Sequence, residues 1–194
     1  MAQFTAINPQ MQVNGQTVLS IANGMGASKR MGLKILEENN IQDPEPERWY
    51  SQQDWLNAFK QISEKIGAGT LFMIGKSIPE NAVFPPHIET IDQALSAIDV
   101  AYHMNHRLAG EQLFNPQTGQ MQEGIGHYKY NKISDSKVEI ICDNPYPCDF
   151  DKGIITAMAR RFKPAHSTRI LISHEKSEGC RGSGDHSCKY VVEW

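Results

Sequence analysis

The sequence predicts an α+β fold in which N-terminal helices pack on a mostly antiparallel sheet that has one helix inserted in it. Segments with helical periodicity come first, up to about residue 106, and segments that alternate apolar and polar residues follow from Gly124 onward. Turn-forming residues separate the later segments at the spacing of hairpins. Because helices and strands are grouped rather than alternating, this order favours α+β over a parallel α/β fold.

Three helices are expected in the N-terminal part. The first spans Lys29 to Glu38 and follows Ser28, a residue type that caps helices. The second begins after Ser51, and its apolar residues recur along one helical face. These residues are Trp55, Leu56, Phe59, Ile62 and Ile66. The third covers about Ile88 to His106 and follows a proline-rich stretch.

The C-terminal part is expected to form the sheet. Its four strands span His127–Ile133, Lys137–Asp143, Thr168–His174 and Ser187–Trp194. A turn at Ser134–Ser136 makes the first two a hairpin, and a helix from Asp149 or Asp151 to about Phe162 is inserted after them. We predict one domain over residues 1–194, with a mainly helical part (1–123) and a sheet part that bears the cysteines (124–194).

Composition narrows the class of protein. Lys and Arg number 19 against 22 Asp and Glu, so there is no basic excess for nucleic acid or anionic lipid. Apolar runs such as Thr70–Ile74 are too short to span a bilayer, and the first residues do not resemble a secretion signal. We therefore expect a cytoplasmic protein with no nucleic-acid or membrane partner, in which cysteines are thiols or metal ligands rather than disulfides.

All four cysteines fall at the ends of expected elements. Five residues separate Cys142 from Cys148, and seven separate Cys180 from Cys188. Four thiolates at one edge of a sheet suit a tetrahedral structural zinc ion. One ligand could instead be a carboxylate or an imidazole, which would leave one cysteine simply buried. The candidates are Glu139, Glu175, Glu178, His174 and His186. The remaining alternatives are four inert buried thiols or a single disulfide.

The run Cys148–Ile155, followed by Cys180–Cys188, resembles the 4-vinyl reductase domain family. In that family a cysteine precedes a helix that contains a glycine, here Gly153. A strand and an acidic segment, here Ser173–Gly179, then lead to a widely spaced cysteine pair with a glycine between. The similar region covers Gly124 to Trp194.

The resemblance implies a small-molecule-binding module, often dimeric, related in fold to trafficking-complex subunits and to haem-based nitric-oxide sensors. In phenol-responsive activators that contain this domain, the cysteines bind zinc beneath an apolar effector pocket. Carried over, Cys148, Cys180 and Cys188 are zinc ligands. The fourth ligand lies upstream, at Cys142 or Glu139, and we favour Cys142 because thiolate is the softer ligand.

We therefore predict a sensory or regulatory domain in signal transduction that binds a small hydrophobic or aromatic ligand between the helices and the sheet. The expected pocket residues are Trp55, Phe59, Ile62, Leu95, Ile98 and Tyr102. A homodimer and a separate signalling protein are the expected partners. No catalytic residue is predicted, because no nucleophile and base arrangement can be recognised.

The alternatives are a haem or tetrapyrrole sensor or enzyme, and a scaffold subunit without a ligand. Haem would take His103, His106 or His87 as axial ligand, although the Tyr-x-Ser-x-Arg propionate clamp of the nitric-oxide sensors is absent. An enzyme acting on a vinyl group would need a reductant site, and none is recognisable. Lone histidines such as His127 are expected to be structural.

Overall fold

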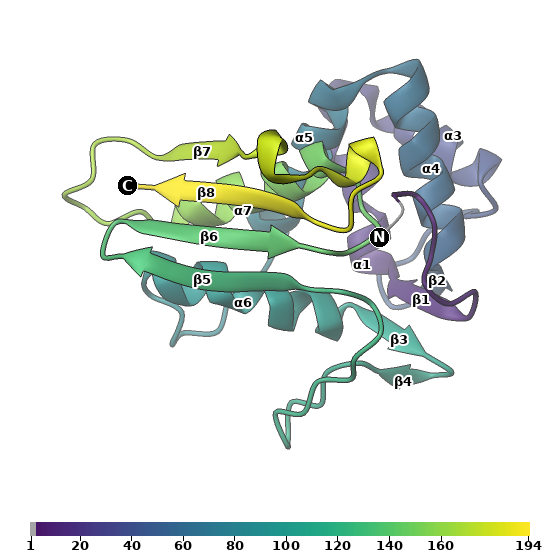
Figure 1. Cartoon of the computed structure of the whole chain (residues 1–194). Helices are drawn as coiled ribbons and strands as arrows, with labels where there is room; N and C mark the ends of the chain where they lie inside the picture. The colour runs from purple at the N-terminus through teal and green to yellow at the C-terminus, as the bar shows by residue number, and fades with distance from the viewer. Residues whose placement is uncertain (1–2) are drawn as a thin grey trace.

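The computed structural model describes residues 3–194 as an α+β fold with two antiparallel sheets, which confirms the predicted fold class. The larger sheet has the strand order β5-β6-β8-β7, and helices α5, α6 and α7 lie behind it (Figure 1). The strands are β5 (Tyr128–Ser134), β6 (Lys137–Cys142), β7 (Leu171–His174) and β8 (Cys188–Glu193). The helices are α5 (Ala68–Asn81), α6 (Ile91–Met104) and α7 (Cys148–Arg161).

The N-terminal part forms one end of the molecule, with α3 (Lys29–Glu38) and α4 (Gln52–Lys65) packed side by side (Figure 1). Ser51 caps α4 as predicted, since its hydroxyl accepts a hydrogen bond from the backbone N–H of Asp54. The short helices α1 (Gly15–Val18) and α2 (Ser20–Gly24) precede this pair.

A second, smaller sheet was not predicted. It has the order β2-β1-β3-β4, formed by β1 (Met11–Asn14), β2 (Trp49–Ser51), β3 (His106–Leu108) and β4 (Glu111–Gln112). These strands are two to four residues long, so their sequences offer no alternation to recognise. The sheet also ends α6 earlier than expected, because His106 belongs to β3 and pairs with Val13.

Helix α5 is also absent from the sequence prediction, and it is the helix that packs most closely on α7. A Cβ atom on Gly75 would lie 2.0 Å from the carbonyl oxygen of Phe150, and one on Gly153 would lie 2.2 Å from that of Phe72. The two glycines therefore let the helix backbones touch. This contact joins the helical and the sheet parts through one hydrophobic cluster.

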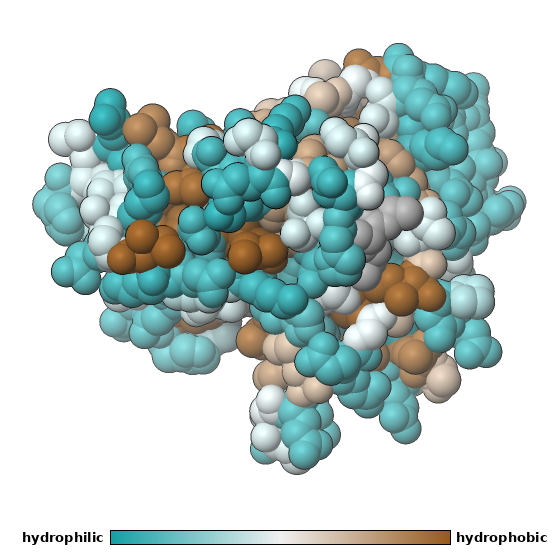
Figure 2. All heavy atoms as spheres, viewed as in Figure 1, coloured by the Kyte–Doolittle hydropathy of each residue, from teal (hydrophilic) through white to brown (hydrophobic). Residues whose placement is uncertain are grey.

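No helix covers the outer face of the larger sheet within residues 3–194 (Figure 1). Figure 2 shows brown apolar side chains among hydrophilic ones on this face. Ile133 and Leu171 are the large exposed apolar residues of its strands. No helix in the described part of the chain is long and apolar enough to cross a membrane.

Candidate functional site

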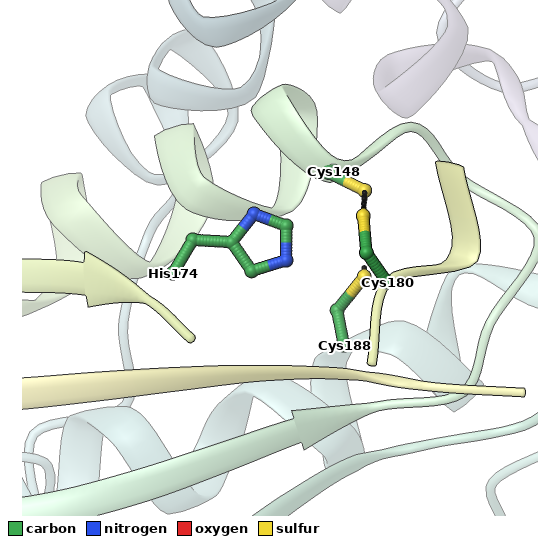
Figure 3. Close-up of side chains that lie close together, drawn as sticks. All are labelled: Cys148, His174, Cys180 and Cys188. Carbon is green, nitrogen blue, oxygen red and sulfur yellow. Dashed lines mark hydrogen bonds between the residues drawn. The ribbon is translucent and has the colours of Figure 1, made fainter. Parts of the chain in front are cut away.

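Three cysteines and one histidine converge beside the N-terminus of α7 (Figure 3). Cys148 is the first residue of α7, His174 ends β7, Cys188 begins β8, and Cys180 lies in the loop between those strands. Their ligand atoms all lie within 4.8 Å of one another. The Cys148 sulfur is 3.3 Å from that of Cys188 and 3.6 Å from that of Cys180. A tetrahedral zinc ion separates its sulfur ligands by roughly 3.8 Å, so a small adjustment would admit one.

His174 has a ring nitrogen available for a metal. Its imidazole points toward the three sulfurs (Figure 3) and stacks on Tyr190 with ring centroids 4.6 Å apart. Its Nε2 atom is buried and has no hydrogen-bond partner among the described residues. Because a buried imidazole nitrogen without a partner is costly, this atom fits a ligand position.

Cys142 lies outside this group. It is fully buried and pairs with Cys188 across β6 and β8. Burial raises the pKa of its thiol well above the ordinary value, so Cys142 stays a neutral buried thiol. Glu139 is engaged elsewhere, with an oxygen 3.4 Å from Lys189 Nζ. The structure thus brings together three of the four predicted ligands, and His174, one of the alternatives held open by the sequence, completes the group.

Within the cysteine group, the Cys188 sulfur is stabilised as a thiolate. A hydrogen bond from Cys148, together with Arg181, lowers the pKa of the Cys188 thiol to about 4. The same bond raises the pKa of Cys148, which keeps its proton while no metal is present. The backbone N–H of Arg181 and its Nε lie 3.3 and 3.4 Å from the Cys188 sulfur. Arg181 therefore offsets the negative charge that this group carries.

A buried hydrogen-bond chain leads from the cysteines to the inner face of the sheet. Arg181 forms an ion pair with Asp151, and both side chains are fully buried. The other oxygen of Asp151 accepts a hydrogen bond of 2.5 Å from the Tyr128 hydroxyl. Burial raises the pKa of Asp151 to about 6 despite the neighbouring arginine. The sequence analysis did not predict the pair of Arg181 and Asp151, because no sequence pattern indicates that an arginine between two cysteines is buried.

A cavity of about 1080 Å³ lies on the other side of Tyr128, bounded by α6, α7 and the segment that joins α5 to α6. Its wall includes three of the predicted pocket residues, Trp55, Ile98 and Tyr102. The other three, Phe59, Ile62 and Leu95, are fully buried in the core and are not on the wall. Further wall residues that the prediction missed are Ile78, Phe84, Phe114, Tyr146, Phe150, Ile154 and Met158. No Lys, Arg, Asp or Glu of the described chain is on the wall.

Two of the three histidines proposed as haem ligands are on the wall, His106 and His87. His106 is buried, and its ring nitrogens lie 2.7 Å from the Tyr102 carbonyl oxygen and 2.5 Å from the Tyr146 hydroxyl. Burial lowers the pKa of His106 to about 4, so its ring is neutral with both nitrogens engaged. His87 is exposed, and the described residues offer its ring no hydrogen bond. His103 is fully buried on α6 and off the wall.

Comparison with known proteins identifies the fold. No protein-family model matches the sequence, and no curated protein matches it. The structure is similar to an H-NOX protein from S. oneidensis with bound Fe(II)NO (TM-score 0.60, 12% identity, 93% of this chain and 98% of that chain). It is also similar to the Fe(II) unliganded H-NOX protein from K. algicida (TM-score 0.58, 11% identity, 93% and 95%). A third neighbour is a single-residue variant of Tt H-NOX (TM-score 0.55, 14% identity, 92% and 91%).

The chain is therefore an α+β domain with the H-NOX fold. The expected relation to the haem nitric-oxide sensors is confirmed at the level of fold. The resemblance to the 4-vinyl reductase domain family stays a prediction.

Proposed function

We propose that this chain is a sensory domain that binds a small uncharged, apolar or aromatic ligand in the cavity and a structural zinc ion at the cysteine group. The wall of the cavity, which carries no charged side chain, is the observation that supports the ligand class. The volume of about 1080 Å³ is slightly above the roughly 300–1,000 Å³ typical of ligand sites. A charged group buried there would lack a partner, which costs several kcal/mol or more.

Zinc at Cys148, His174, Cys180 and Cys188 would be structural. Three thiolates and one imidazole complete a tetrahedral shell and leave no open position for substrate. The ion would tie the loop between β7 and β8 to the N-terminus of α7, the helix whose Phe150, Ile154 and Met158 are on the cavity wall. The zinc site would therefore hold one side of the ligand cavity in place.

Haem is the second candidate ligand, and the fold comparison favours it. The structural neighbours include H-NOX proteins with ferrous iron, and work on them concerns haem distortion. His87 could supply an axial nitrogen at the rim of the cavity. Against haem, the wall itself has no Lys or Arg to pair with its propionates, both nitrogens of His106 are engaged, and Arg161 at the rim already donates to the Pro79 carbonyl and lies over the Phe84 ring. The wall chemistry therefore favours an uncharged ligand.

One purification distinguishes the two ligands. Elemental analysis and a visible spectrum of untagged protein should give one zinc per chain and no haem absorption band. Nile red, an uncharged apolar dye, should bind and gain fluorescence. Haemin should produce no stoichiometric shift of its absorption band on titration.

A haemin complex formed by the wild type and by His166→Ala, but lost in His87→Ala, would overturn the uncharged-ligand proposal in favour of haem. His166 is the matched control because it is exposed and off the cavity wall. Protein without zinc would overturn the metal assignment.

A homodimer and a separate signalling protein are the partners expected in this proposal. Light scattering of the zinc-loaded protein, with and without the bound dye, tests the first. A monomer under both conditions would remove dimerisation from the proposal.

A further inference from the structure

A second group of metal-ligand side chains lies on the far side of α6 from the cavity. Asp99 and His103 are one turn apart on α6, and His127 immediately precedes β5. One ligand atom from each residue lies within 4.8 Å of the other two. None of the three is on the cavity wall or in the cysteine group.

His127 lies between two carboxylates. Its Nδ1 is 2.9 Å from Asp99 Oδ2, and its Nε2 is 2.8 Å from Glu123 Oε2. Burial opposes a charge on this ring, but the two carboxylates raise the pKa of His127 above its ordinary value. Without a metal, a proton therefore holds this arrangement together.

His103 supplies the independent observation that points to a ligand. It is fully buried, and its Nδ1 lies 2.8 Å from the Asp99 carbonyl oxygen. If Nδ1 donates its proton there, Nε2 carries a lone pair, yet Nε2 is buried with no hydrogen-bond partner among the described residues. The His103 and His127 rings are 5.0 Å apart. A backbone carbonyl that fixes the tautomer is the usual support for a metal-binding imidazole.

We propose that Asp99, His103 and His127 form a second metal site, for a divalent ion of the zinc and nickel class. Two imidazoles and a carboxylate suit these ions. Glu123, whose side chain is 81% exposed, contacts the opposite ring nitrogen of His127, so it would orient that ring from the surface and water would complete the shell of the ion. The metal would replace the proton between His127 Nδ1 and Asp99, while Nε2 keeps its proton toward Glu123, and it would join the end of α6 to the start of β5.

The affinity of this site depends on pH because the ion competes with a proton. Three carboxylates surround His127. Asp99 and Glu123 contact its ring, and Asp143 accepts a hydrogen bond from its backbone N–H. Lys129 is the one cation in these contacts, and it donates to Asp143. The net excess of carboxylates favours a cation. Because the ion takes the place of a proton on the His127 ring, binding should weaken as the pH falls.

The test is calorimetric titration of full-length purified protein, with its resident metal first counted by elemental analysis. Ni²⁺ is the probe, in two buffers of different ionisation enthalpy at pH 7.5. The wild type should bind one added equivalent with release of protons, seen as a binding heat that differs between the two buffers. His127→Gln should weaken binding at least tenfold, and Glu123→Gln less. His166→Ala, an exposed histidine outside the group, should bind like the wild type.

Equal binding by the wild type and His127→Gln, or no binding of an added equivalent by the wild type, would overturn the proposal. His127 and Glu123 are partly exposed, so these variants are expected to fold, and their melting temperature in EDTA verifies it. The comparison holds whether or not the cysteine group contains zinc, because each variant keeps that group unchanged.

Discussion

The two faces of α7 differ in the side chains that they bury: one face buries charged groups and the other buries apolar ones. Toward the cysteines, Cys148 contacts Cys188, and Arg181 pairs with both the Cys188 sulfur and Asp151, so the charges there have partners. Toward the cavity, Phe150, Ile154 and Met158 follow at four-residue spacing and are part of a wall that carries no charged side chain. The contrast teaches that this helix buries charge only where it is compensated. One face is therefore suited to an ion and the other to a neutral molecule.

The sharpest test of the polar face removes a ligand. Cys180→Ser and Cys188→Ser should each lower the free energy of unfolding by about 4 kcal/mol or more, because structural metal binding is part of the folding free energy. Urea unfolding in the presence of zinc measures this. Cys142→Ala is the control, and it should retain zinc at a cost of about 1 kcal/mol. Zinc lost in Cys142→Ala but kept in His174→Ala would instead make Cys142 the fourth ligand.

The buried ion pair should show the next largest effect. Asp151→Asn leaves Arg181 charged and unpaired, which should lower the free energy of unfolding by about 3–5 kcal/mol. The double variant Asp151→Leu with Arg181→Met should recover much of this loss, since both charges are then gone. Equal stability of the wild type and Asp151→Asn in urea would contradict a compensated buried pair.

A smaller effect is expected from acid on the cavity side. His106 has a folded pKa of about 4 against an ordinary value near 6.5, so its neutral form is the one that the folded state holds. Its contribution is complete above pH 6.5 and is lost as the pH falls toward 4. Lowering the pH from 7 to 5 should therefore reduce the free energy of unfolding by about 2 kcal/mol through His106 alone.

Urea unfolding of the wild type and of His106→Gln at pH 7 and pH 5 measures the contribution of His106 to this loss of stability. His127 titrates in the opposite sense, because its raised pKa stabilises the fold at low pH and that contribution is lost as the pH rises. An identical pH dependence in His106→Gln and the wild type would contradict the assignment.

The smallest expected effect is on ligand binding in the cavity. Ala97→Trp places an indole in the cavity and should weaken Nile red binding about tenfold, which is about 1.4 kcal/mol, with little change in stability. Ser96→Trp, exposed on the same helix and off the wall, should bind the dye like the wild type. Equal binding by both variants would place the dye elsewhere.

The sequence anticipated elements whose signals are local. Ser51 and the apolar stripe after it predicted α4, and alternation around a short turn predicted the β5–β6 hairpin. Helix α5 was missed because Gly75 and Pro79 lie inside it, and its close packing on α7 needs a glycine that propensity disfavours. Periodicity marks which face is buried, but it does not say which buried side chains border a void.

The same limit explains the candidate site. Three cysteines follow from their positions at element ends, whereas His174 becomes a neighbour only through the register of β7 on β8. Phe59 and Trp55 lie on one helical stripe, yet only Trp55 reaches the cavity.

The wall tyrosines carry a consequence for what the cavity can recognise. Tyr102 gives its hydroxyl proton to the Ile125 carbonyl, Tyr128 to Asp151, and Tyr146 lies against the His106 ring nitrogen that has no other partner. Trp55 is different, because its indole N–H is buried without a partner in the described chain. Because the Trp55 N–H is itself buried, a molecule in the cavity would meet Trp55 and the three tyrosines as aromatic surface and not as hydrogen-bond donors.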